Sequence, residues 1–177
     1  MRVAAVTVSE LPEVLVLQAK LQGALATLRP AHPVSILDVS PGVETGIALT
    51  RLARQETRRL RFMTYAWSGD KPRESFGGPP EPMVEKGALP GLHFSRGSFD
   101  FVVGVDVLGR MEPRSRSRCL GELAATALRA VWLVESPGDG VRESDLRDCL
   151  LEAAVGPGSV SEVRGVFVVE WAPGRAA

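Results

Sequence analysis

The chain has 177 residues, of which 45% are hydrophobic and 24% charged, and its 21 basic side chains balance 21 acidic ones. This composition is typical of a globular domain and excludes a disordered chain, and a net charge of zero gives no electrostatic reason to expect nucleic acid. No apolar run reaches the roughly 18 residues of a membrane span, and the first residues lack the apolar core of a signal peptide. We therefore predict a cytoplasmic protein with neither a membrane nor a nucleic-acid partner.

The first part of the chain predicts a helix followed by a βαβ unit. Apolar residues recur every three or four positions over 9–29, which indicates an amphipathic helix with Ser9 as its N-cap. A short apolar strand follows at 34–39, and the glycine and proline of segment 40–46 predict a turn. A helix and then an aromatic and β-branched strand over 61–67 complete the unit.

Strands and helices continue to alternate in the rest of the chain. We expect a loop rich in glycine and proline at 68–82, a weak strand at 83–89 and a strong apolar strand at 99–105. A helix at 113–129, a strand at 130–134, a helix at 143–154 and a terminal hairpin at 160–171 follow. The strands at 34–39, 99–105 and 130–134 are apolar almost throughout, as strands covered on both faces are, so we expect them to be adjacent and central. The prediction is an α/β three-layer sandwich, with a mostly parallel sheet and a C-terminal antiparallel hairpin.

The two cysteines indicate neither a disulfide nor a metal site. Cys119 and Cys149 both fall on apolar stripes of predicted helices, without a CxxC spacing or a nearby histidine pair. We predict two buried, reduced thiols and no bound metal.

Two segments together resemble a known family. Val34-Ser-Ile-Leu-Asp-Val-Ser-Pro-Gly42 is similar to the first motif of class I S-adenosylmethionine (SAM) methyltransferases, a strand that ends in an acidic residue before a glycine-rich turn. Ser98-Phe-Asp-Phe-Val-Val-Gly-Val-Asp-Val-Leu108 is similar to the fourth strand of that family. The resemblance covers about residues 34–135 and implies one methyltransferase-like domain over 1–177, with an N-terminal helix and linker (1–33) before a Rossmann-like core (34–177).

The resemblance also implies where SAM would bind. The cofactor would lie across the carboxyl ends of the strands, above the turn after the first strand, with its ribose held by a carboxylate at the end of the second. The positions implied as cofactor-binding are Asp38, Ser40, Gly42, Glu44, Tyr65, Ala66, Trp67 and Asp70. Asp38 and Gly42 match the motif, whereas Ser40 and Glu44 replace glycines, and Ala66 stands where the ribose carboxylate is expected.

Each of these residues also has a structural interpretation. Asp38 either holds the amino-acid end of SAM or caps the turn, since aspartate bonds to local backbone donors. Tyr65 and Trp67 either stack on an adenine or are core aromatics, and Asp70 replaces the ribose carboxylate only if its loop folds back. Asp106, at the end of a central strand, is the candidate catalytic residue, with the capping of the next segment as the alternative.

Two functions remain open at this point. The departures from the motif favour a methyltransferase-like domain with a weakened or lost SAM site, acting as a binding or regulatory partner of another protein or of a second copy of the chain. The family favours a small active SAM-dependent methyltransferase with an unknown acceptor, since methyl transfer depends mainly on positioning. In the first case SAM binds weakly, with a dissociation constant on the order of 100 μM or higher.

Overall fold

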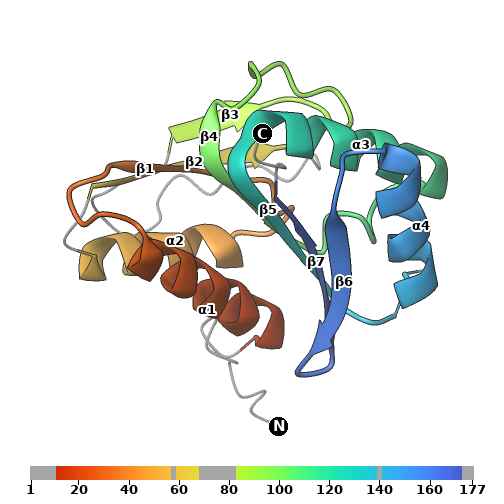
Figure 1. Cartoon of the computed structure of the whole chain (residues 1–177), viewed down its shortest axis with the longest axis horizontal. Helices are drawn as coiled ribbons and strands as arrows, with labels where there is room; N and C mark the ends of the chain where they lie inside the picture. The colour runs from red at the N-terminus through yellow and green to blue at the C-terminus, as the bar shows by residue number, and fades with distance from the viewer. Residues whose placement is uncertain (1–10, 57–58, 68–82, 139–140, 173–177) are drawn as a thin grey trace, which may run out of the picture.

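The computed structural model describes residues 11–56, 59–67, 83–138 and 141–172. They form a seven-stranded sheet between two layers of helices (Figure 1). The elements in chain order are α1 (Pro12–Thr27), β1 (Val34–Asp38), α2 (Glu44–Gln55), β2 (Leu60–Ala66), β3 (Met83–Lys86), β4 (Phe99–Val105), α3 (Pro113–Thr126), β5 (Ala127–Glu135), α4 (Glu143–Ala153), β6 (Gly158–Val163) and β7 (Val166–Trp171).

The strand order is β3-β2-β1-β4-β5-β7-β6, in which β1 to β5 run parallel and β7 pairs antiparallel with both β5 and β6. The predicted fold class is therefore confirmed, including the terminal hairpin. The three strands predicted to be central, β1, β4 and β5, are adjacent, and neither edge of the sheet is formed by one of them. After β1 the chain continues toward one edge of the sheet, and with β4 it returns to the other side of β1, so the strand order reverses between β1 and β4.

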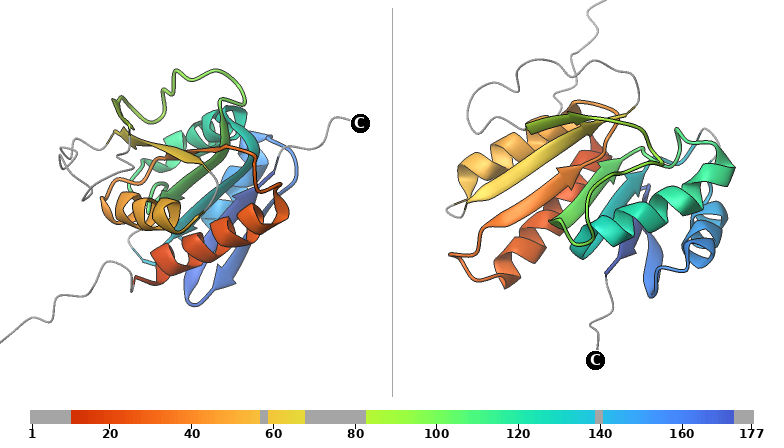
Figure 2. Two further views of the ribbon diagram at one scale, coloured as in Figure 1. Left: turned by 90° about the vertical axis from the view of Figure 1, so that its left-hand side faces the viewer. Right: turned by 90° about the horizontal axis from the view of Figure 1, so that it is seen from above.

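A helical layer covers each face of the sheet (Figure 2). The helices α1 and α2 pack on one face, over a core that includes Leu17, Leu21, Leu49, Phe101 and Trp132. The helices α3 and α4 pack on the other face, over Leu37, Val102, Leu120, Leu133 and Leu146. Burial on both faces explains why the central strands are apolar at almost every position.

Several predicted boundaries differ from those of the structure by a few residues, and three of the differences have a clear physical reason. The first helix begins at Pro12 behind an extended Leu11, so Ser9 is not its N-cap; the fixed φ of proline suits a helix start. The turn predicted over 40–46 ends at Val43, because α2 begins at Glu44, whose carboxylate is favoured in a first turn. The helix predicted to reach residue 129 ends at Thr126, where β5 begins to pair with β4.

That last difference places one apolar residue on a strand. Leu128, which falls within the predicted helix, lies on β5 and is 55% exposed. Tertiary pairing with β4 overrides the helical propensity of this segment. The loop predicted at 68–82, and with it Asp70, lies outside the described residues.

Both cysteines are free and buried, as predicted. Burial raises the pKa of the Cys119 thiol to about 12 and also raises the pKa of Cys149. Within the described ranges, no helix has the length and apolar character needed to cross a membrane.

Candidate functional site

A cavity of about 280 Å³ opens at the carboxyl ends of β1 and β4, where the strand order reverses. Ligands of open α/β sheets bind at such a point because the connections leave the sheet on opposite sides and a crevice forms between them. Three parts of the chain line the cavity: the first turn of α1, the turn between β1 and α2, and the end of β4. The lining residues include Leu11, Glu13, Ser40, Gly42, Glu44, Asp106 and Arg110.

Asp38 ends β1 and is completely buried. Its Oδ1 accepts a hydrogen bond from the backbone N–H of Ser40 (3.0 Å), whereas its Oδ2 is buried and has no hydrogen-bond partner among the described residues. Burial raises the pKa of Asp38 to about 7, and the charge of Glu44 raises it further against the lowering effect of the Ser40 bonds. The bond from Ser40 to Oδ1 is thus the predicted turn-capping contact, and Oδ2 is the carboxyl oxygen that could still accept a hydrogen bond.

Ser40 joins the carboxyl ends of β1 and β4 through its side chain. Its Oγ donates to the Oγ1 of Thr45 (2.9 Å) and accepts from the backbone N–H of Val105 (3.0 Å), and the residue is almost completely buried. A glycine at this position would leave the hydroxyl's place open. The serine side chain therefore forms a fixed bridge between the two strands that border the crevice, which a glycine at this position would not form.

Glu44 lies over the turn that the motif would use for a cofactor. A Cβ atom placed on Gly42 would collide with the carboxylate of Glu44, so that carboxylate packs directly on the face of the glycine. Glu44 is also the first residue of α2, where the helix dipole stabilises a negative charge. The face of Gly42 is therefore covered by a side chain of the same turn.

At the end of β2 the three predicted residues have different surroundings. The indole Nε1 of Trp67 donates to the carbonyl oxygen of Val39 (2.7 Å), so the ring spans from β2 to the end of β1. Tyr65 is completely buried, packs edge-on against Phe94 (ring centroids 5.7 Å apart) and lines neither of the crevice cavities. The carbonyl of Ala66 accepts from Gly87 N–H (3.1 Å), so its backbone extends the contact with β3.

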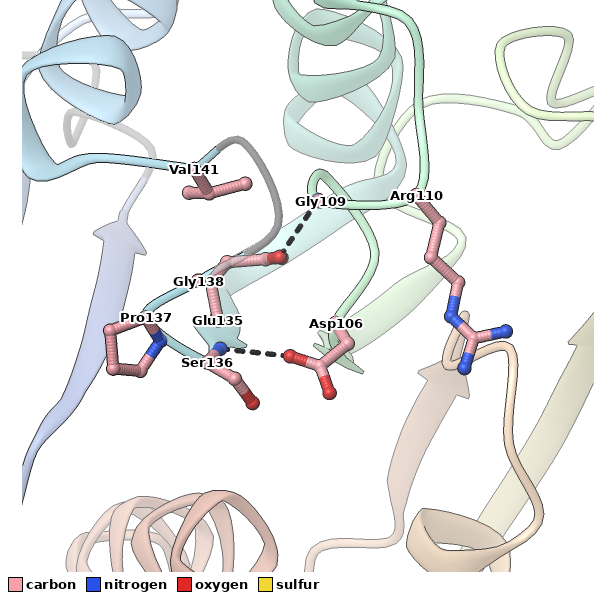
Figure 3. Close-up of a pocket in the computed structure, with 8 residues that line it drawn as sticks. All are labelled: Asp106, Gly109, Arg110, Glu135, Ser136, Pro137, Gly138 and Val141. Atoms are coloured by element: carbon pink, nitrogen blue, oxygen red, sulfur yellow. Dashed lines mark hydrogen bonds between the residues drawn. The ribbon is translucent and has the colours of Figure 1, made fainter.

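A second cavity, of about 210 Å³, adjoins the first on the β5 side (Figure 3). Asp106 and Arg110 line both cavities. Asp106 follows β4 in a left-handed conformation (φ 53°), and its Oδ1 accepts from the backbone N–H of Ser136 (2.8 Å). Aspartate tolerates this conformation better than most residues, and it places the carboxylate at the junction of the two cavities.

Glu135, which ends β5, organises the loop after β4. Its buried carboxylate accepts backbone N–H bonds from three consecutive residues, Val107, Leu108 and Gly109, at 3.1, 3.0 and 3.0 Å. Burial raises the pKa of Glu135 to about 7, and the charge of Asp106 adds to this effect. Since its oxygens already accept these bonds, the role of Glu135 is to hold the backbone of the loop that forms one wall of the second cavity.

The sequence did not indicate that the first turn of α1 would border this site. Glu13 Oε1 accepts a hydrogen bond from the Oγ of Ser136 (2.8 Å), which ties α1 to the end of β5. The two residues are 123 positions apart, and neither belongs to a motif. No local signal could have paired them, because the contact depends on how α1 packs across β5.

Of the predicted residues, Ser40, Gly42, Glu44 and Asp106 line one cavity. Asp38 lies buried beneath the same turn and bonds to Ser40, and Trp67 bonds to Val39 at the end of β1 without lining the cavity. Their roles toward a cofactor stay predictions. Within the described part of the chain, no group of three or more histidine, cysteine, aspartate or glutamate side chains is arranged to hold a metal ion.

No family model matches the sequence, and no curated protein matches it either. Solved structures do. The magnesium protoporphyrin IX methyltransferase ChlM of Synechocystis PCC 6803, solved with bound SAM, is 18% identical with a TM-score of 0.64, over 91% of this chain and 78% of that one. The CurJ carbon methyltransferase is 12% identical with a TM-score of 0.73, over 95% of this chain and 55% of that one.

A third similar structure is a chain of the Haloferax volcanii complex that contains the Trm112 methyltransferase activator. It is 14% identical with a TM-score of 0.62, over 93% of this chain and 98% of that one. These likenesses show that the chain has the class I methyltransferase fold, as the two motifs predicted. The chain spans about half of the length of CurJ.

Proposed function

We propose that this chain is a methyltransferase-like domain with a weakened SAM site, and that it acts as a binding or regulatory partner rather than as a catalyst. One observation supports the proposal: side chains of the chain itself make contacts at the turn after β1, where the resemblance would place the cofactor. Ser40 bridges β1 to β4, the carboxylate of Glu44 covers Gly42, and the indole of Trp67 bonds to the end of β1. A cofactor would have to displace these contacts.

The missing ribose carboxylate supports the same proposal. A hydrogen bond to a charged acceptor contributes about 1.5–3 kcal/mol, and each 1.4 kcal/mol is a factor of ten in affinity. The end of β2 offers the methyl group of Ala66 instead of a carboxylate. Together with the covered turn, this loss would move a micromolar SAM site to a dissociation constant on the order of 100 μM or higher.

Calorimetric titration of the purified chain with SAM and with S-adenosylhomocysteine tests this proposal. We expect weak binding or none, and little thermal stabilisation at low micromolar SAM, because stabilisation grows with the logarithm of ligand concentration over dissociation constant. A clear rise in melting temperature at low micromolar SAM would overturn the proposal and favour an enzyme.

Rebuilding the site provides a second prediction. We expect Ala66→Asp combined with Glu44→Gly to tighten SAM binding by at least about tenfold, since one charged hydrogen bond is regained and Gly42 is uncovered. Adding Ser40→Gly should help only if the bridge to Val105 is not needed to keep the crevice in shape. Ala66→Asn with Glu44→Gly is the matched control, as it adds similar bulk without the charge. Equal binding by the two variants would contradict the predicted role of a carboxylate at this position.

An active SAM-dependent methyltransferase is the second candidate. It is favoured by the open cavity at the strand reversal and by Asp106, which lines both cavities and has one carboxylate oxygen outside its bond to Ser136 (Figure 3). Asp106 would then act on the acceptor side as a general base. In the regulatory case, the partner would be another protein or a second copy of this chain, and the Trm112-containing neighbour shows that one protein of this fold forms such a complex.

A further inference from the structure

A groove of about 440 Å³ lies at the end of the sheet opposite the crevice. It is lined by the turn 96–97 before β4, the C-terminal end of α3, the start of β5, and the side chains of Val155 and Trp171. Because β4 and β5 are parallel and end at the crevice, their first residues lie at the other end of the sheet. The groove is therefore separate from the two cavities described above and shares no lining residue with them.

The floor and one wall of the groove are apolar. Trp171 is almost completely buried, and its Nε1 already donates to the carbonyl oxygen of Val155 (2.6 Å), so the indole offers the groove an apolar surface. Leu128 is more than half exposed, and a Cβ atom placed on Gly97 would lie 3.5 Å from its Cδ1, so the leucine lies against that glycine. The end of α3 and the start of β5 add alanine methyl groups. An apolar surface that is hollowed in this way favours a ligand with an apolar part.

The charge at this groove is positive. Among the described residues that line it, Arg96 alone is charged. The exposed guanidinium of Arg96 makes no hydrogen bond or ion pair with another described residue. The nearest acid along the chain, Asp100, is already bonded to Ser35 and to Arg129. An arginine without a carboxylate partner favours an anionic group, since its planar guanidinium can donate two parallel N–H bonds to one carboxylate.

We propose that this groove binds an aliphatic monocarboxylate of the medium-chain fatty-acid type. The carboxylate pairs with Arg96, and the aliphatic chain lies along Leu128 and over Trp171. One cation beside an apolar groove matches one carboxylate at the end of an apolar chain, and the volume lies within the range of small-molecule sites. The inference goes beyond the proposed function, because it concerns the opposite end of the sheet and does not depend on whether SAM binds.

Calorimetric titration of the full chain with hexanoate, octanoate and decanoate tests the proposal. We expect decanoate to bind with a dissociation constant below about 1 mM, and the affinity to rise about two- to fourfold for each added methylene, because each buries more apolar surface. Octylammonium has the same chain as octanoate and the opposite charge, so it should bind at least about tenfold more weakly. If decanoate does not bind at millimolar concentration, or if octylammonium binds as well as octanoate, the proposal is wrong.

Two variants at exposed positions locate the ligand. Arg96→Ala should abolish the preference for octanoate over octylammonium, whereas Leu128→Ser should weaken decanoate binding at least about fivefold and keep that preference. Arg51→Ala, at an exposed position of α2, and Leu151→Ala, at an exposed position of α4 outside the groove, are the matched controls and should change neither. Unchanged binding by both Arg96→Ala and Leu128→Ser would overturn the assignment.

Sedimentation velocity distinguishes a ligand site from a contact between two copies of the chain. We expect Leu128→Ser to sediment like the parent chain. A dimer that this substitution dissociates, together with no binding of decanoate, would show that the groove is a subunit interface and would overturn the proposal. A parallel titration with SAM separates the two proposals: tight SAM binding refutes only the proposed function, whereas a failure of decanoate to bind refutes only this inference.

Discussion

Replacing Glu135 by alanine is expected to lower the free energy of unfolding by about 4 kcal/mol. The carboxylate accepts three backbone N–H bonds, and two of the donors, those of Val107 and Leu108, belong to completely buried residues. An orphaned buried donor costs about 1–3 kcal/mol, and a cavity is left as well. Relief of the buried charge offsets part of this loss. In a chain of 177 residues the change corresponds to a fall in melting temperature on the order of 10 °C.

Chemical denaturation and thermal melts at pH 7 measure this effect. Glu152→Ala is the matched control, because it removes an exposed glutamate from α4 and should change the free energy of unfolding by no more than about 0.5 kcal/mol. Glu135→Gln keeps one carbonyl acceptor, so its free energy of unfolding should lie between those of Glu135→Ala and Glu152→Ala. If Glu135→Ala melted like the control, Glu135 would not organise the loop after β4.

Asp38→Asn is expected to stabilise the chain at pH 8 and not at pH 4. Burial holds the pKa of Asp38 at about 7, above its ordinary value of 3.8, so ionisation opposes folding. The contribution of the protonated carboxyl group to the free energy of unfolding is complete below pH 4 and is lost as the pH rises through 7. A shift of about three units corresponds to about 4 kcal/mol at most. Asparagine keeps an acceptor for Ser40 and carries no charge, so we expect a gain of about 2–4 kcal/mol at pH 8.

Melting temperatures of both proteins between pH 4 and pH 8 test this expectation. The difference in stability between Asp38→Asn and the parent chain should grow with pH between about pH 4 and pH 7 and level off above pH 7, because only between the two pKa values does the folded chain hold a proton that the unfolded chain has lost. Subtraction removes the titration of Glu135, which is present in both proteins. Glu112→Gln, at a side chain that is 66% exposed, is the control and should give a small difference at every pH. A constant difference for Asp38→Asn would mean that the group is not buried as an acid.

The sequence by itself determined the frame of the site. Continuous apolar segments predicted β1, β4 and β5 as adjacent central strands, because only strands covered on both faces are apolar on both. The acidic residue and glycine after the first strand predicted a turn at the edge of the sheet where carboxyl ends of parallel strands lie, and Ser40, Gly42 and Glu44 of that segment line the cavity found there. Turn and helix boundaries shifted by a few residues, because capping and strand pairing decide them.

Only the tertiary structure decided how the crevice is filled. The hydrogen bonds of Trp67 to Val39, of Ser136 to Glu13 and of the 107–109 backbone to Glu135 all join residues that are far apart in the sequence. Periodicity reports which face of an element is buried, but not which distant side chain it meets there. The Oδ2 of Asp38, which has no partner among the residues that the structure describes, depends on the same packing, because a polar group lacks a partner only once every neighbour has been placed.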